Sequence, residues 1–168
     1  TFTGTETVTV DVKAATRTIT LNAADLDVTS ATVDGKAVRF ALDKDKQQLV
    51  LTLPVAATVG RHTVGFAWSG KINQSAAGLF AIDYTNQDGS KARMLATQFE
   101  APDARRFAPM WDEPAFKAKF KLKAVVPAGQ LGISNMPATS VTKQANGTQL
   151  YSFAETPVMS SYLLYLGM

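Results

Sequence analysis

The sequence contains no cysteine and only one histidine, His62. This shortage of metal-binding side chains limits the metal chemistry that the chain can perform. Without cysteine no disulfide can form, and this absence is compatible with either the cytoplasm or the periplasm. A catalytic zinc site needs three protein ligands, which usually include histidines, so the chain is not expected to assemble one. His62 lies beside the start of an expected strand and is not expected to bind a metal ion.

Long apolar runs and a strong net charge are also missing. No stretch approaches the roughly 18 apolar residues of a transmembrane helix, so no membrane segment is expected. The 17 basic and 14 acidic residues give a net charge of +3, which is too mild to favour nucleic-acid binding. The 168 residues suit one domain over residues 1–168 with a real core. Because Thr1 is not preceded by an initiator Met, we expect that an upstream segment has been removed.

Alternation of apolar and polar residues runs through the sequence and predicts an all-β fold. The segment 33–36 reads Val-Asp-Gly-Lys and predicts a hairpin, since Asp-Gly readily adopts the positive φ of a type I′ turn. A strand is expected from Phe116 to Val125, with one apolar face and one solvated face of lysines. About ten such strands predict two packed, mostly antiparallel sheets, a β-sandwich with little helix.

The segment 97–114, TQFEAPDARRFAPMWDEP, carries most of the functional information. Gln98 and Glu100 are two residues apart, so on an extended strand they would point to the same side, about 7 Å apart. Phe99 would then point to the opposite face and enter the core.

The charged and proline residues that follow Glu100 are interpreted as structural. Arginine–carboxylate forks can satisfy the backbone of a turn and lock a corner in place, and proline fixes φ on either side of it. We therefore expect a rigid corner built from Asp103, Arg105, Asp112, Glu113 and Pro114.

This segment resembles the T-Q-x-E-x-x-D-A-R-x-x-x-P-x-x-D-E-P signature of zinc aminopeptidases of the aminopeptidase N type, the gluzincin family. Two further segments agree with it. Residues 134–137 resemble the family's S-N-M-P, and residues 156–164 resemble its T-P-x-M-S-[ST]-Y-L-[LV]. The three motif blocks come in the family's order, and the resemblance covers nearly the whole chain.

The resemblance implies that the chain is the N-terminal β domain of a larger peptidase that acts on peptide N-termini. Its zinc cofactor would belong to a catalytic domain with GAMEN and HExxH motifs, which this chain lacks. The resemblance also implies that Glu100 binds the substrate's free α-amino group and that Gln98 lines the pocket for the first side chain. The alternative for Glu100 is a surface or salt-bridged glutamate without a role in binding. The alternative for Gln98 is a cross-strand polar pair. Alone, the chain is expected to be inactive.

Two other functions stay open at this point. Composition and strand pattern equally allow a free-standing binding module, such as a carbohydrate-binding or adhesion sandwich, although such a module has no reason to carry the block at 97–114. A catalytically inactive scaffold homologue of the family is the other alternative. An HExxH motif downstream would separate an active peptidase from a scaffold.

Overall fold

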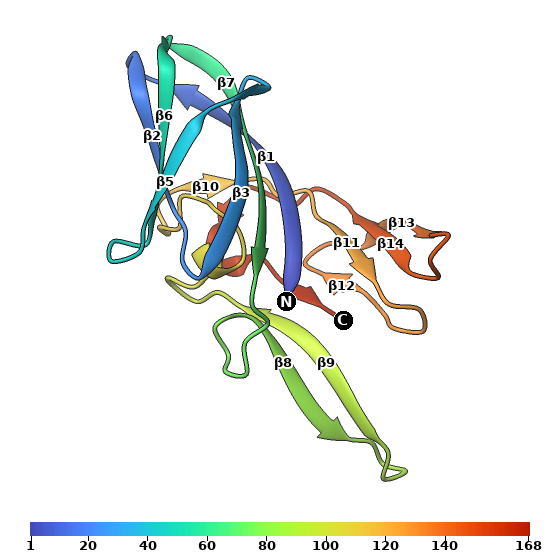
Figure 1. Ribbon diagram of the computed structural model, residues 1–168. Coiled ribbons are helices and arrows are strands. Elements are labelled where there is room, and N and C mark those ends of the chain that lie inside the picture. The colour runs from blue at the N-terminus through green and yellow to red at the C-terminus, as the bar shows by residue number, and fades with distance from the viewer. The chain divides into compact units, whose positions relative to one another are not determined.

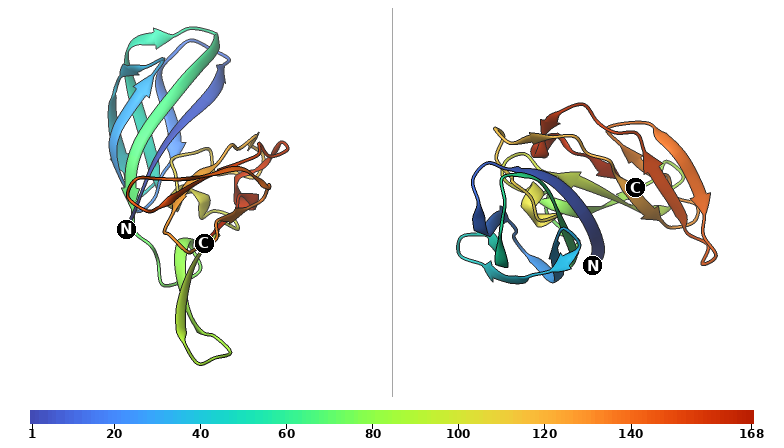
Figure 2. Two further views of the ribbon diagram at one scale, coloured as in Figure 1. Left: turned by 90° about the vertical axis from the view of Figure 1, so that its right-hand side faces the viewer. Right: turned by 90° about the horizontal axis from the view of Figure 1, so that it is seen from above.

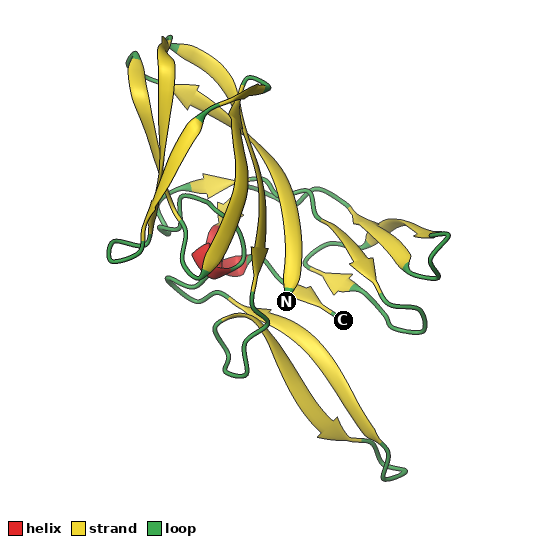
Figure 3. Cartoon of the chain, in the orientation of Figure 1, coloured by secondary structure: helices red, strands yellow, loops and turns green.

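The computed structural model describes all residues from 1 to 168 and confirms the all-β prediction. Strands joined by loops make up the chain, with two single-turn 3₁₀ helices, η1 (Ala104–Arg106) and η2 (Ser161–Leu163), and no α-helix (Figure 3). None of these helices has the length and apolar character needed to cross a membrane.

Contacts within the chain divide it into two compact units. The first contains residues 1–71 and 105–111, and the second contains residues 72–104 and 112–168. The single domain predicted for residues 1–168 stays a prediction, and each unit is described by itself.

The first unit consists of two antiparallel sheets that face each other, as the view from above shows (Figure 2). One sheet has the order β1-β7-β3-β4, formed by Phe2–Val12, Gly60–Gly70, Leu26–Val33 and Lys36–Ala37. The other has the order β2-β6-β5, formed by Thr16–Asn22, Gln48–Ala57 and Arg39–Asp43.

The core of this unit follows directly from the alternation in the sequence. Every second residue of β6 is buried at Leu49, Leu51 and Leu53, and β7 buries Val64, Phe66 and Trp68 in the same way. Full burial of one such aliphatic side chain contributes roughly 1.5–3 kcal/mol. Packing of the two apolar faces therefore stabilises the sandwich.

The hairpin predicted at residues 33–36 is present between β3 and β4. Asp34 and Gly35 have φ values of 50° and 73°, and Val33 pairs with Lys36. Two successive positive φ angles are what a type I′ turn requires, and the Asp-Gly pair supplies them at little steric cost.

The second unit contains three antiparallel sheets. The first has the order β12-β16-β9-β8, formed by Ile133–Ser134, Leu166–Gly167, Lys91–Gln98 and Gly78–Thr85. The second has the order β11-β14-β13, formed by Lys123–Val126, Gln149–Phe153 and Ala138–Lys143. The third pairs β10 (Lys117–Ala118) with β15 (Met159–Ser160). Within this unit β8 and β9 extend as a two-stranded arm (Figure 1).

The continuous strand predicted from Phe116 to Val125 is wrong in its middle and at its start. The segment pairs first with β15 and then, from residue 123, with β14, so it changes partner on the way. Between the two ladders the Phe120 N–H donates to the Thr156 side-chain oxygen at 3.0 Å instead of to a strand carbonyl. Phe116 is 53% exposed and is not part of the core. The lysines are solvent-exposed as predicted: Lys117, Lys119, Lys121 and Lys123.

Candidate functional site

Residues 105–111 of the block at 97–114 are folded into the first unit. Asn22 and Met110 exchange two backbone hydrogen bonds, of 2.8 and 3.0 Å. The Trp68 indole N–H donates to the Phe107 carbonyl oxygen at 2.8 Å, and the Phe107 ring stacks on Phe2 with centroids 5.6 Å apart. These contacts come from the backbone and from aromatic rings, so the segment 105–111 completes the core of this unit.

The two arginines of the block contact residues of the first unit. Arg105 Nη1 donates to Gln47 Oε1 at 3.2 Å, and Arg106 forms an ion pair with Asp25. These contacts suit the structural role expected for Arg105. A fork between Arg105 and Asp103 stays a prediction.

Gln98 and Glu100 do not share a strand face as predicted, because β9 ends at Gln98. The Gln98 Oε1 accepts a hydrogen bond from the Glu100 backbone N–H at 2.7 Å. The Gln98 amide oxygen thus replaces the carbonyl of a neighbouring strand as the acceptor for the Glu100 N–H. The chain turns from Glu100 onward. Both side chains are exposed, whereas Phe99 between them is 1% exposed and belongs to the core as predicted.

The first and the last motif blocks contact each other in the second unit. The Ser161 hydroxyl donates to Asp112 Oδ1 at 2.7 Å, and both residues are buried. The neighbouring Ser160 hydroxyl donates to the Pro114 carbonyl oxygen at 2.7 Å. Two adjacent serines thus hold the Asp-Glu-Pro end of the first block. The side chain of Glu113, between these two anchor points, is exposed.

The Ser-Asn-Met-Pro block is joined to the last block by the same kind of contact. Asn135 Nδ2 donates to the Leu163 carbonyl oxygen, and Asn135 Oδ1 accepts the Tyr165 N–H, both at 2.7 Å. The Ser134 hydroxyl donates to the Tyr165 carbonyl oxygen at 2.6 Å. An asparagine side chain both donates and accepts, so it can replace a strand neighbour for the chain that leaves η2.

Sequence reasoning did not single out the uncharged residues that make these contacts. Thr97 is a further example, because its buried hydroxyl oxygen accepts the Leu166 N–H at 2.9 Å. Charged side chains suggest chemistry by their type, whereas a hydroxyl or an amide does so only when its partner is known. The available signal was their position in the motif blocks: Thr97, Ser134, Asn135, Ser160 and Ser161.

Glu6 is a half-buried acid that sequence reasoning also missed. It lies on the inward-facing side of β1, directly opposite the buried Phe66 of β7. Its Oε1 is buried and has no hydrogen-bond partner. Because burial disfavours the charged form, the pKa of Glu6 rises from 4.5 to about 8. The sequence contained one clue, because Glu6 lies two and four residues before Val8 and Val10 and therefore shares the apolar face of their strand.

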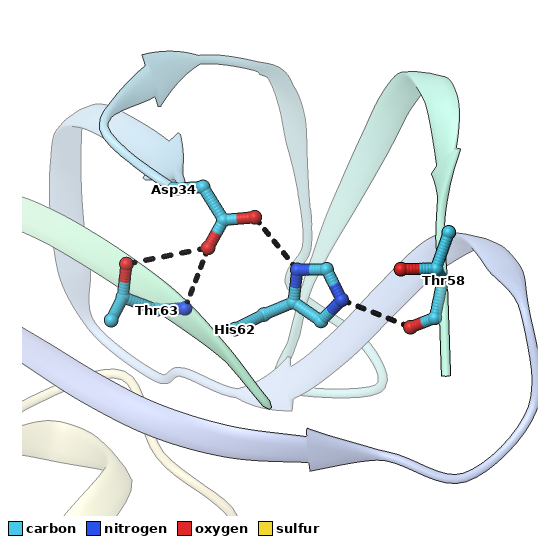
Figure 4. Close-up of polar contacts among 4 residues, drawn as sticks. All are labelled: Asp34, Thr58, His62 and Thr63. Carbon is cyan, nitrogen blue, oxygen red and sulfur yellow. Dashed lines mark hydrogen bonds and ion pairs between the residues drawn. The ribbon is translucent and has the colours of Figure 1, made fainter. Parts of the chain in front are cut away.

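His62 is held in a polar cluster at the edge of the first unit (Figure 4). Its Nδ1 lies 2.7 Å from Asp34 Oδ2, and its Nε2 lies 2.9 Å from the Thr58 carbonyl oxygen. Both partners are acceptors, so the cationic ring satisfies both by donating from each nitrogen. The hydrogen bond to Asp34, and next that to Thr58, raises the pKa of His62.

Asp34 is stabilised in its ionised form by the same cluster. The backbone N–H of Thr63 donates to Asp34 Oδ1 at 2.9 Å and, together with His62, lowers the pKa of Asp34. Both ring nitrogens of His62 already have hydrogen-bond partners. The cluster therefore links the β3–β4 turn to β7 and does not present the histidine as a metal ligand.

Two surface grooves of the structure lie away from Gln98 and Glu100 in the sequence and include neither residue. One, of about 260 Å³, lies at the ends of β1 and β2 beside Trp111, and the other, of about 550 Å³, lies on the arm beside Asp83 and Arg93. No group of three or more histidine, cysteine, aspartate or glutamate side chains is arranged to hold a metal ion. The donors of this chain therefore do not fit a zinc ion, which the resemblance assigns to a separate catalytic domain.

The all-β fold and the hydrogen bonds that the last motif block makes with the other two agree with the N-terminal β domain that the resemblance implies. The model of the Peptidase M1 N-terminal domain matches residues 1–163, and the chain belongs to this family.

Similar proteins carry aminopeptidase names. The chain is 42% identical over 166 residues to aminopeptidase N of Acetobacter pasteurianus, covering 98% of this chain and 47% of that protein. It is 40% identical to aminopeptidase M1-C of Oryza sativa subsp. japonica, covering 97% of this chain and 19% of the relative. It is 37% identical to leucyl aminopeptidase of Saccharolobus solfataricus, with 94% and 19% covered. The chain thus spans from about a fifth to about half of these relatives.

Proposed function

We propose that this chain acts as the substrate-recognition part of a zinc-dependent aminopeptidase that removes N-terminal residues from peptides. The family and the aminopeptidase names of its relatives support this proposal. In this proposal the catalytic domain of the same polypeptide holds the zinc, which supplies an activated water for attack on the first peptide bond. The residues of this chain contribute to binding and not to that step.

The single observation that carries the proposal is the setting of Glu100. Its side chain is exposed directly after β9, and its backbone N–H is fixed by Gln98 Oε1 at 2.7 Å. An exposed carboxylate that follows this held backbone position can accept short, charge-assisted hydrogen bonds from a substrate's terminal ammonium. Glu100 would thereby select peptides with a free α-amino group.

Gln98 has a different part in the proposal. Its Oε1 already accepts the Glu100 N–H, which leaves its amide N–H groups as donors toward a ligand. An exposed donor beside the ammonium anchor suits the rim of the pocket for the first side chain.

The experiment is to assay the longer protein, purified with its metal, on an aminoacyl anilide and on the N-acetylated form of the same compound. We expect release from the free amine and at most a small fraction of that rate from the blocked one, because only the free amine presents a charge to Glu100. Cleavage of both at equal rates would contradict amino-group recognition. No cleavage of either would favour the scaffold alternative.

A further inference from the structure

The segment from Lys119 to Lys123, here named the lysine edge, is covered by neighbouring backbone on one side only. It leads into β11, the last strand in the order β11-β14-β13. On the covered side the Leu122 C=O accepts the Phe153 N–H at 3.0 Å. The Phe120 C=O accepts the Thr156 N–H, also at 3.0 Å. Phe120 and Leu122 therefore direct their backbone groups toward the covered side.

The lysines of this segment direct their backbone groups to the opposite, open side, because successive residues of an extended chain alternate in this direction. Exposure alternates in the same way. Lys119, Lys121 and Lys123 are exposed, whereas Phe120 and Leu122 are half-buried. No strand pairs with the three lysines on the open side. Each lysine thus presents an N–H donor and a C=O acceptor without a strand beside them.

The lysine side chains give this open edge a concentrated positive charge. Every second side chain of an extended chain points to the same face, about 7 Å from the next. Lys119 forms an ion pair with Glu155 at 3.1 Å, whereas Lys121 and Lys123 form none. Lysines on an open edge oppose pairing with apolar or basic strands. The lysine edge therefore admits a strand only if that strand carries acidic residues.

We propose that the lysine edge binds an extended acidic segment of a partner protein, which adds to it as a further strand. The added strand runs antiparallel, as the other pairs of this sheet do. Its acidic residues lie opposite Lys119, Lys121 and Lys123, where opposite charges on one face stabilise a strand pair. Its remaining residues continue the face of Phe120 and Leu122 and are therefore apolar. The partner segment thus alternates acidic with apolar residues.

Charge and backbone together select this occupant over two others. A second copy of the lysine edge would place lysines opposite lysines, and like charges directly opposite each other destabilise a strand pair. A nucleic acid would neutralise the ammonium groups, but its backbone cannot continue a ladder of peptide hydrogen bonds. An acidic strand satisfies both the charges and the open N–H and C=O groups.

The test measures binding of a synthetic peptide in which glutamate alternates with valine, with both ends blocked, to the protein at low salt. Two N-methylated forms of this peptide are the matched controls, because in the proposed pairing only the glutamate N–H groups bond to the lysine edge. Methylation of the glutamate amides should weaken binding at least about tenfold, and methylation of the valine amides should leave it within about threefold. Amide hydrogen exchange of Lys121 and Lys123 should slow on binding, while that of Leu122 should not.

A pair of protein variants locates the bound peptide. Lys121→Glu reverses the central charge of the lysine edge and should weaken binding of the unmodified peptide at least about tenfold. Lys143→Glu, at an exposed lysine of β13 in the same sheet, is the matched control and should stay within about threefold of the parent protein.

Four results would overturn the proposal. They are absence of peptide binding, an equal effect of methylation at the glutamate and valine amides, an equal effect of Lys121→Glu and Lys143→Glu, and binding of a single-stranded oligonucleotide in place of the peptide. The second would show attraction by charge alone. Because the blocked peptide has no free α-amino group, its binding is independent of the role proposed for Glu100, and either proposal can fail without the other.

Discussion

The Ser161 hydroxyl donates a 2.7 Å hydrogen bond to Asp112 Oδ1, and this contact joins two motif blocks that are 49 residues apart in the sequence. The two residues are 3% and 2% exposed. An acid buried to this degree requires donors, because a buried carboxylate without them costs several kcal/mol. A contribution to the stability of the fold therefore explains the presence of Ser161 and Asp112 in the motif blocks, and no catalytic role is needed to explain them.

Ser161→Ala should destabilise the protein more than Ser160→Ala. The first change removes a donor from a buried acid, which costs roughly 1.5–3 kcal/mol, whereas the second removes a bond to the neutral Pro114 carbonyl, worth about 0.5–1.5 kcal/mol. At about 2–4 °C per kcal/mol for a chain of this size, Ser161→Ala should lower Tm by roughly 3–12 °C. Thermal unfolding of the two variants side by side checks this. A smaller loss for Ser161→Ala would mean that other contacts hold Asp112.

Arg105→Ala should lower the free energy of unfolding by at least about 1 kcal/mol. It removes the hydrogen bond from Arg105 Nη1 to the half-buried Gln47 side chain. Arg106→Ala is the matched comparison, since it breaks an ion pair with Asp25, whose side chain is 64% exposed, and such surface pairs contribute about 0–1 kcal/mol. Urea unfolding measures both. An unchanged midpoint for Arg105→Ala would remove the arginine from the structural set.

The single histidine gives one imidazole signal, so NMR can follow His62 directly. We expect its pKa to lie above 6.5, because Asp34 and Thr58 both accept from the ring. The pair stabilises the fold fully below 6.5, and this stabilisation is lost as pH rises through the raised pKa. Asp34→Asn should move the pKa of His62 down. A wild-type pKa at or below 6.5 would contradict the geometry.

Glu6 should make the protein less stable as pH rises. Its pKa is raised from 4.5 to about 8, so between these values the folded state holds a proton that the unfolded state releases. The free energy of unfolding should fall by roughly 3–5 kcal/mol across this window and then level off. Urea unfolding near pH 5 and near pH 8 measures the fall.

Glu6→Gln separates this effect from that of His62, which acts in the same direction. The variant keeps the shape of the side chain but cannot ionise, so it should lose most of the pH dependence while His62 still titrates. Parallel curves for the variant and the parent protein would show that Glu6 reaches solvent or a partner.

Part of this fold followed from residue type and spacing. Alternation placed Leu49 and Leu51 in the core, and Asp34-Gly35 marked a turn, because period and turn chemistry are local properties. The break at Phe120 could not be predicted, since it depends on the side chain of Thr156, which is distant in sequence. Longer-range contacts decide where a regular pattern stops being a regular strand.

The candidate site shows the same division. Phe99 was placed correctly in the core by its position, but the end of β9 at Gln98 was missed. That end depends on Gln98 itself, whose side chain takes over the Glu100 N–H. Roles of serine and asparagine, such as those of Ser161 and Asn135, became visible only with their partners in place.

Replacement of Glu100 in the longer protein tests the proposed recognition of the amino terminus most directly. Glu100→Ala and Glu100→Gln should each reduce kcat/KM on one aminoacyl anilide by roughly 10- to 150-fold, since a hydrogen bond to a charged group is worth about 1.5–3 kcal/mol. Glu113→Gln, an exposed glutamate of the same block, is the matched control and should stay within about threefold of the parent protein. If both Glu100 variants also stay within about threefold, Glu100 does not anchor the substrate.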